Sequence, residues 1–268
     1  MMEPKLALCN FYPETDALRR TALAQGVSGV DWAFKTADLP QNEWEEARLM
    51  KDISRLRPLE VRYHCAFPGI DLGDADTDRA EEAFETFRDS CRLVSRLEGQ
   101  FMTVHLGLGR DTTEELCWDR TLKALGELVD YGREQGVHVC LENLAWGWSS
   151  RPPLFEKLVR KSGAGVTLDI GHAQVCDSVQ SRQYDFEDFV TPHAAHVLNA
   201  HVYHEERHES HVPPQAVKDV CDRLRLLRAL PCDWWVLELR EEAALMETLR
   251  VVRRFLESEP CECEKLVY

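Results

Sequence analysis

Residues 137–143 read Val-His-Val-Cys-Leu-Glu-Asn, an almost unbroken apolar run that ends on a carboxylate and an amide. A second run of this kind, Trp-Trp-Val-Leu-Glu at 234–238, lies near the other end of the chain. Strands that are covered by helices have this composition, because neither row of side chains meets water. The two runs therefore predict strands of a parallel sheet in an α/β protein.

Six further short apolar runs alternate with longer amphipathic stretches along the chain. The predicted strands are 6–11, 27–34, 59–65, 101–106, 137–142, 165–169, 197–203 and 234–239. The predicted helices are 15–25, 42–56, 78–97, 112–135, 153–161, 185–195, 214–229 and 241–257, with Asp111 as the expected N-cap of the fourth. Eight helices thus follow eight strands in strict alternation.

Strict alternation of strands and helices predicts a parallel sheet with right-handed crossovers. Eight units favour closure into a (β/α)8 TIM barrel, and the length of 268 residues suits one such barrel. The open doubly wound sheet is the alternative, but no Gly-x-Gly-x-x-Gly follows the first strand. We expect a single domain over 1–268 with a short C-terminal tail at 258–268.

The candidate active-site residues lie where the predicted strands end, since the active site of this barrel type lies at the carboxyl ends of its strands. Six consecutive strands finish on an acid or an imidazole. In chain order these residues are His64, His105, Glu142, Asp169 (followed by His172), His201 and Glu238.

A divalent metal ion is the simplest reason for these residues to converge. Any one of them alone would be read as a salt bridge, a helix cap or a hydrogen-bonded core residue. Three or four carboxylates at one barrel mouth would repel one another, and a cation relieves that repulsion. Mixed carboxylate and imidazole ligands suit Mn, Co, Zn or Mg and do not decide among them.

The segment after the seventh strand is rich in histidine, with six of the ten histidines between 193 and 211. His193 and His196 fall on the preceding helix and are interpreted as structural, whereas His204 and His208 are expected in a solvated loop. Arg207 and His211 are the candidates for substrate contacts.

The composition restricts the class of partner. The net charge of −15 disfavours nucleic acid and anionic membranes, and no stretch is apolar enough to span a bilayer, so we expect a small-molecule substrate. Ten scattered cysteines without a secretory signal indicate reduced thiols and a cytoplasmic protein. The close pair Cys261 and Cys263 is interpreted as an incidental feature of the tail. A homo-oligomer is compatible with the sequence.

The strand ends resemble those of the xylose isomerase-like TIM barrel superfamily, which contains sugar isomerases, ketose 3-epimerases, inosose dehydratases and the endonuclease IV group. The matching motifs are Leu-Glu142-Asn143, Leu-Asp169-Ile-Gly-His172, the strand with His201, the segment Glu209-Ser-His211-Val-Pro, and Leu-Glu238. The resemblance covers essentially the whole barrel and is not specific to one activity.

Resemblance to the epimerases implies one metal ion on Glu142, Asp169, His201 and Glu238. The metal would chelate the carbonyl and adjacent hydroxyl of a ketose and stabilise the enediolate, while Glu142 and Glu238 remove and return the proton. His64, His105, His172, Arg207 and His211 would bind substrate, and Arg207 lies six residues after His201, as a substrate arginine does in ketose epimerases.

Resemblance to endonuclease IV implies up to three zinc ions. His64, His105 and Glu142 would hold one; Asp169, His201 and Glu238 would hold the second, with Glu142 bridging; His172, Glu209 and His211 would hold the third. Glu209 is the departure, because that branch has Asp there.

The leading hypothesis is therefore a metal-dependent sugar or sugar-phosphate isomerase or epimerase. The alternative is a multi-metal phosphodiester hydrolase, acting on a small nucleotide-like substrate rather than on DNA because the chain is acidic. A non-catalytic barrel that binds a metabolite or partner is the third hypothesis.

Overall fold

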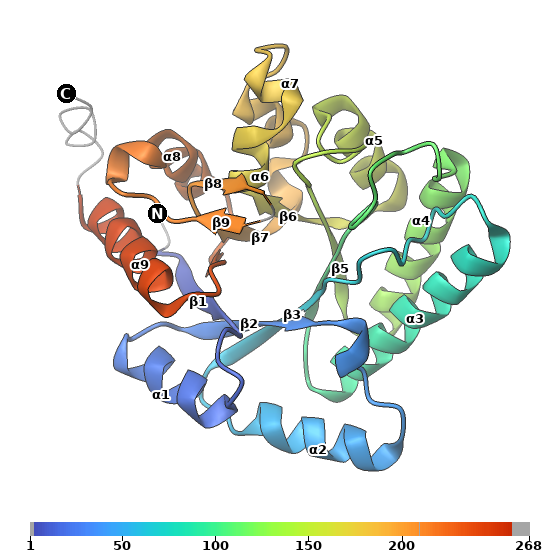
Figure 1. The fold of residues 1–268 in the computed structure, drawn as a ribbon, viewed down its shortest axis with the longest axis horizontal. Coiled ribbons are helices and arrows are strands. Elements are labelled where there is room, and N and C mark those ends of the chain that lie inside the picture. The colour runs from blue at the N-terminus through green and yellow to red at the C-terminus, as the bar shows by residue number, and fades with distance from the viewer. Residues whose placement is uncertain (1–2, 209, 259–268) are drawn as a thin grey trace.

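The eight predicted strands form a closed parallel barrel. The computed structural model describes residues 3–208 and 210–258. The strands lie in the order β1-β10-β7-β6-β5-β4-β3-β2, with every neighbouring pair parallel and helices around the outside (Figure 1). Their bounds are β1 Lys5–Cys9, β2 Gly29–Phe34, β3 Glu60–Cys65, β4 Phe101–Val104, β5 His138–Glu142, β6 Gly165–Asp169, β7 Val197–Val202 and β10 Trp234–Leu237. The predicted (β/α)8 fold is confirmed.

Most of the predicted helices are present. The long α-helices are α1 Thr15–Ala24, α2 Glu43–Ser54, α3 Thr77–Arg96, α4 Trp118–Glu134, α5 Pro152–Ser162, α8 Cys221–Ala229 and α9 Glu242–Glu257. The shorter ones are α6 Ile170–Val175 and α7 Asp177–Gln180, with 3₁₀ turns η1 Thr36–Asp38, η2 Phe186–Phe189, η3 Thr191–His196 and η4 Val217–Asp219. Among the described residues, no helix combines the length and apolar character needed to cross a bilayer.

The predicted start of the fourth helix, with Asp111 as its cap, was wrong. The helix α4 begins at Trp118, because the chain before it pairs with the loop after β3. Leu116 forms an isolated antiparallel bridge with Asp74, and the amide of Cys117 donates to the carbonyl of Gly73 at 2.7 Å. These non-local hydrogen bonds replace the first helical turns that the sequence pattern suggested.

Two other helical predictions were only partly right. The region 185–195 forms the separate turns η2 and η3 instead of one helix, and His193 inside η3 has a non-helical backbone (φ −143°, ψ 32°). The region 214–229 is an α-helix only from Cys221 onwards. Pro192 removes a backbone donor inside the first region, where η3 begins. In the second region the 3₁₀ turn η4 takes the place of the first helical turns.

A hairpin that the sequence did not predict crosses the barrel mouth. It consists of β8 Glu205–Arg207 and β9 Ser210–Val212, which pair antiparallel with Glu206 opposite His211 (Figure 1). Because neighbouring residues of a strand alternate in direction, the pairing fixes which hairpin side chains can reach the mouth.

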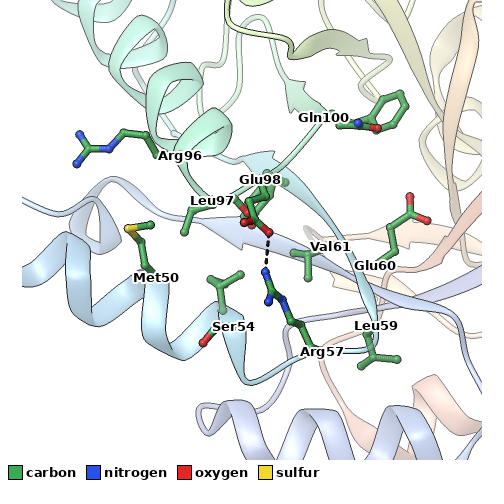
Figure 2. A pocket seen from close by; sticks show the side chains of 13 residues that line it. Met50, Ser54, Arg57, Leu59, Glu60, Val61, Arg96, Leu97, Glu98 and Gln100 are labelled. Carbon is green, nitrogen blue, oxygen red and sulfur yellow. Dashed lines mark hydrogen bonds and ion pairs between the residues drawn. The ribbon is translucent and has the colours of Figure 1, made fainter.

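The opposite, amino-terminal end of the barrel carries its own cavity. It measures about 320 Å³ and lies between the end of α2 and the starts of β3 and β4. The Arg57–Glu98 ion pair, 2.6 Å long, crosses it, and no imidazole or cysteine lines it (Figure 2). Without such groups this cavity offers no catalytic constellation.

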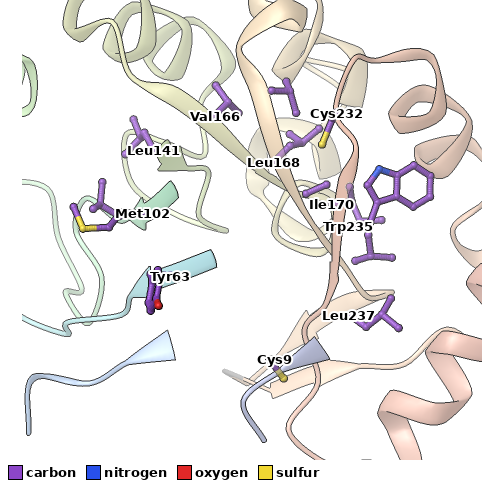
Figure 3. Close-up of a cluster of buried hydrophobic side chains, with 14 of the residues drawn as sticks. Cys9, Tyr63, Met102, Leu141, Val166, Leu168, Ile170, Cys232, Trp235 and Leu237 are labelled. Atoms are coloured by element: carbon purple, nitrogen blue, oxygen red, sulfur yellow. The ribbon is translucent and has the colours of Figure 1, made fainter. Parts of the chain in front are cut away.

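The main hydrophobic core lies between the barrel and its helices. Successive strands contribute outward-facing side chains to it, including Tyr63, Met102, Leu141, Val166 and Trp235, all buried (Figure 3). The opposite faces of the same strands therefore point into the barrel.

The barrel interior carries a hydrogen-bonded polar layer. Thr103 and Thr167 share a 2.7 Å hydrogen bond between hydroxyls, and the Asn199 amide donates to Thr167 at 3.1 Å. Arg62 donates to the Asn199 side-chain oxygen at 2.6 Å, and its guanidinium lies 3.9 Å from the ring centroid of Phe101. Each of the four polar residues lies two positions before a candidate site residue that is on the same strand or, for His105, directly after it, so the layer supports the site from below.

The barrel leaves no room for a side chain at Gly29, because a Cβ there would lie 2.2 Å from the Trp234 ring and 2.5 Å from the Glu60 carbonyl. We expect Gly29→Ala to lower the free energy of unfolding by about 1–3 kcal/mol through overpacking. The matched control is Gly126→Ala on α4, where the nearest atom would be 3.9 Å away; it should stabilise by about 0.5–1 kcal/mol. Urea denaturation of both variants tests the pair, and equal effects would contradict this description of the barrel interior.

Candidate metal centre

Four side chains from four neighbouring strands converge at the barrel mouth. Glu142 and Asp169 are the last residues of β5 and β6, His201 lies on β7, and Glu238 directly follows β10. One ligand atom from each lies within 4.8 Å of all the others. The convergence arises because parallel strands that are adjacent in a barrel end at the same rim.

His201 lies at the centre of this group. Its Nδ1 is 3.0 Å from Oε2 of Glu238, 3.3 Å from Oε2 of Glu142 and 3.7 Å from Oδ2 of Asp169. The side chains of Glu142, Asp169 and His201 are almost fully buried, whereas that of Glu238 is 17% exposed. Solvent and substrate can therefore reach the group from the side of Glu238.

The same atoms lack hydrogen-bond partners among the described residues. Oε2 of Glu142, Oδ2 of Asp169, Oε2 of Glu238 and both ring nitrogens of His201 are buried and unsatisfied. Buried polar atoms without partners are rare in native proteins, and leaving several at one point is costly. A divalent cation would satisfy the carboxylate oxygens and one imidazole nitrogen at once, so the donor set fits a metal ion.

Electrostatics at the group tie the imidazole to the carboxylates. Burial alone would lower the pKa of His201, but Glu142 and Glu238 outweigh it and raise that pKa well above its ordinary value. Burial would raise the pKa of Glu142, yet His201 and His105 hold it well below its usual range. Without a metal, the two carboxylates therefore favour the protonated form of His201.

A second set of ligand-capable side chains shares Glu142. Nε2 of His64 and Nε2 of His105 lie 3.1 Å apart, and they are 3.5 Å and 3.2 Å from Oε2 of Glu142. In a hydrogen bond between these two Nε2 atoms, one nitrogen donates its proton and the other accepts it. At least one of the two rings therefore has an unprotonated Nε2, the form that can bind a metal. Burial and His64 oppose protonation of His105, and the pKa of His105 is lowered despite Glu142.

A third set lies on the other side of Glu238. It consists of His172, Glu206 and His211, and Nε2 of His172 is 3.5 Å from Oε2 of Glu206. Nδ1 of His172 is 3.0 Å from the Asn143 carbonyl oxygen, and Nδ1 of His211 is 2.6 Å from the Glu238 carbonyl oxygen. Donation from both Nδ1 atoms leaves both Nε2 atoms as acceptors, as in histidines that bind metals.

The glycine in Leu-Asp169-Ile-Gly171-His172 has a packing reason. A Cβ at Gly171 would lie 2.1 Å from the ring of Tyr203, which stacks on His211 with centroids 3.9 Å apart. The amide of His172 also donates to Oδ1 of Asp169 at 2.6 Å. The motif thus fixes the position of the His172 ring relative to the aspartate.

The remaining predicted residues lie outside these sets. The side chain of Arg207 is 66% exposed and forms an ion pair with Glu205, so its role in substrate binding stays a prediction. His193 is buried with Nε2 2.6 Å from the Phe189 carbonyl oxygen, in agreement with its structural interpretation. Glu209 and the pair Cys261 and Cys263 lie outside the described residues.

Two buried or partly buried carboxylates near the site were missed in the sequence. Oδ2 of Asp31, on β2, lies 3.6 Å from Nδ1 of His64. Asp31 is a charged residue inside an apolar strand, and that signal was available. The sequence around Glu206 contains no such signal. Its side chain comes close to His172 only because β8 and β9 pair as a hairpin.

Comparison with known families gives a match over most of the chain. Residues 20–255 match the family model described as "Xylose isomerase-like TIM barrel". An uncharacterised protein of Methanocaldococcus jannaschii is 24% identical over 166 residues, which cover 62% of this chain and 71% of that protein.

Solved structures share the fold at low identity. A D-tagatose 3-epimerase-like protein is 16% identical, with a TM-score of 0.72 over 97% of this chain and 99% of its own. Endonuclease IV from Thermus thermophilus is 17% identical, with a TM-score of 0.65 over 95% of this chain and 99% of its own. At this level of identity the similarity establishes the fold only. The reaction has to be inferred from the residues of the site.

Metal binding should depend on pH with a defined sign. Glu142 and Glu238 raise the pKa of His201 and favour its protonated form in the metal-free site, and a bound metal would displace that proton. We expect Zn²⁺ or Mn²⁺ to bind more tightly as pH rises from about 6 to 8, with proton release on binding. Calorimetry in buffers of different ionisation enthalpy measures the release. His138→Gln, at the exposed start of β5, should retain it, whereas binding without proton release would contradict the assignment.

Proposed function

The chain belongs to the xylose isomerase-like TIM barrel family, and from that premise we propose that it is a metal-dependent sugar or sugar-phosphate isomerase or epimerase. One observation carries the proposal: the four converging side chains all present a buried ligand atom that no other described group satisfies. Glu142, Asp169, His201 and Glu238 would hold one divalent ion, and Mn, Co, Zn and Mg all suit this donor set. The acidic chain favours a small-molecule substrate over nucleic acid.

The reaction needs a base beside a carbon that carries both a hydroxyl group and an adjacent carbonyl. When bound, a divalent ion supplies Lewis-acid polarisation of such oxygens, which makes the neighbouring C–H proton more acidic. Glu238 is the partly exposed carboxylate and can accept this proton, and the buried Glu142 can return one. Nδ1 of His172 faces the Asn143 carbonyl oxygen, so its Nε2, 3.5 Å from Oε2 of Glu206, can accept a hydrogen bond from a substrate hydroxyl.

The surroundings of these carboxylates would keep bulk water away from the reacting carbon. Asp169, His201 and Glu142 are almost fully buried, and the hairpin β8–β9 lies over the mouth with His211 bonded to the Glu238 carbonyl. His64 and His105 would contact substrate from the opposite side of Glu142. A dry, pre-organised site strengthens each of these polar contacts.

The acid–base role can be measured through exchange of a carbon-bound proton with solvent. The metal-loaded protein is incubated in D₂O with a panel of ketoses and ketose phosphates, and deuterium incorporation is followed by NMR. We expect Glu238→Gln to slow exchange by about 100- to 10,000-fold, since it removes a positioned base. Glu134→Gln, an exposed glutamate at the far end of α4, should exchange at the wild-type rate. Wild-type exchange in a folded Glu238→Gln variant would remove this residue from the mechanism and revive a non-catalytic role for the barrel.

A second candidate function has an observation of its own. The sets His64–His105–Glu142 and His172–Glu206–His211 flank the four-ligand group and would extend it to three metal positions. Three zinc ions would support hydrolysis of a phosphodiester, as the resemblance to endonuclease IV implies, with a small nucleotide-like substrate suited to the acidic chain. Glu206 would then supply the carboxylate of the third position.

Metal content separates the two functions. The isomerase proposal expects about one ion per chain, and it expects His64→Ala and His105→Ala to leave that number unchanged. The hydrolase candidate expects about three zinc ions per chain and the loss of about one with either substitution. Elemental analysis of purified protein measures the number of metal ions per chain. His138→Ala is the control, because it also removes one histidine but not one of the candidate ligands. Three zinc ions together with phosphodiesterase activity would overturn the isomerase proposal.

A further inference from the structure

A large cavity opens beside the partly exposed carboxylate of Glu238. Its volume is about 780 Å³, and its lining includes Cys9 and Asn10 of the first strand end, Trp32 of β2, and Glu238 with Arg240 after β10. The strands β10, β1 and β2 are neighbours in the barrel. The cavity is therefore the space at the mouth through which a molecule would approach Glu238 from this side.

The wall of the cavity is rigid and partly aromatic. The side chain of Asn10 accepts a hydrogen bond from the Ala33 amide at 2.9 Å and donates to the Ala33 carbonyl at 3.1 Å. This pair of bonds joins the end of β1 to the end of β2. Phe11 and Tyr12 follow, with ring centroids 4.3 Å apart, and form an apolar face. A wall of this kind suits a sugar-sized molecule with one apolar face.

Three cations line this cavity, Lys35, Arg48 and Arg240, and none of them forms an ion pair with a described carboxylate. The guanidinium of Arg48 lies over the Trp44 ring, 5.9 Å from its centroid, whereas Lys35 and Arg240 have no such contact among the described residues. Arg240 lies two residues beyond Glu238, and Lys35 directly follows β2, so these two cations stand on the two strands that flank β1.

The acidic residues of the same cavity are already engaged. Asp38 accepts a hydrogen bond from the Lys35 backbone amide at 3.0 Å, and Asp52 pairs with Arg55 at 3.4 Å. Glu45 accepts from the Gln41 backbone amide at 2.8 Å. These carboxylates lie before α2 (Asp38), in its first turn (Glu45) and near its end (Asp52), and none of these contacts neutralises the side chain of Lys35 or Arg240.

We propose that this cavity binds the anionic end of the substrate, so that Lys35 and Arg240 select a phosphorylated or carboxylated sugar over a neutral one. The inference rests on the proposed function, since the reacting carbon would lie at Glu238 and the anionic group further out in the cavity. Arg240 suits this role because a guanidinium can donate two parallel hydrogen bonds to a phosphate or a carboxylate. Arg207, which the sequence suggested as the substrate arginine, instead has its guanidinium on Glu205.

The test compares matched pairs of neutral and anionic ketoses on metal-loaded protein by calorimetry. D-Ribulose is paired with D-ribulose 5-phosphate, and D-fructose with D-fructuronate, so the two pairs distinguish a phosphate from a carboxylate. We expect the anionic member of at least one pair to bind about tenfold more tightly or better. Arg240→Gln and Lys35→Gln should each reduce that preference by about threefold, and the double variant should abolish it.

The controls separate this inference from the proposed function. Lys161→Gln, an exposed cation at the end of α5 that pairs with no described carboxylate, should retain the full preference. Metal content of Arg240→Gln should match the wild type, since Arg240 is not among the ligand-capable residues. Equal binding of both members in each pair, or an anion preference that survives the double variant, would overturn the inference. A preference that depends on the two cations in a protein without deuterium exchange would support the anion site and reject the isomerase function.

Discussion

The structure depends on one electrostatic constraint, which is the burial of several carboxylates at one end of a barrel. Glu142, Asp169 and Glu238 each direct an oxygen towards Nδ1 of His201, and these oxygens have no other described partner. Like charges at these separations are costly in a region that excludes water. The raised pKa of His201 is the response available to the chain alone, because a protonated imidazole partly offsets the repulsion. A divalent ion offsets it more completely and also satisfies the orphaned oxygens.

The barrel provides this constraint through the two-residue period of its strands. Residues at alternate positions face inward, so the layer of Arg62, Thr103, Thr167 and Asn199 lies directly below the layer that holds the ligands. The lower layer is internally hydrogen-bonded, whereas the upper layer presents free acceptor atoms. The hydrogen bonds of the lower layer fix the strands relative to one another. The polar atoms of the upper layer remain available to bind a ligand.

The sequence predicted what depends on local pattern and on strand ends. All eight barrel strands and the closed fold followed from the apolar runs, and the convergence of Glu142, Asp169, His201 and Glu238 followed from the acids and imidazoles at six of the strand ends. The errors came where distant segments decide the local structure. The start of α4 was misplaced because Leu116 pairs with Asp74, and Glu206 was missed because a three-residue hairpin strand sets its direction. No periodicity within either segment carries that information.

Glu142 links the number of metal ions to the type of reaction. Its Oε2 lies within 3.2–3.5 Å of ring nitrogens from His105, His201 and His64. In a site with one ion, His64 and His105 remain free to bind substrate, and Glu142 keeps an oxygen that can carry a proton. A carboxylate that bridges two ions has both oxygens committed, and its basicity falls because two cations stabilise the anionic form. Proton transfer between carbon and Glu142 is therefore incompatible with a bridging role, so the two candidate functions require different states of the same side chain.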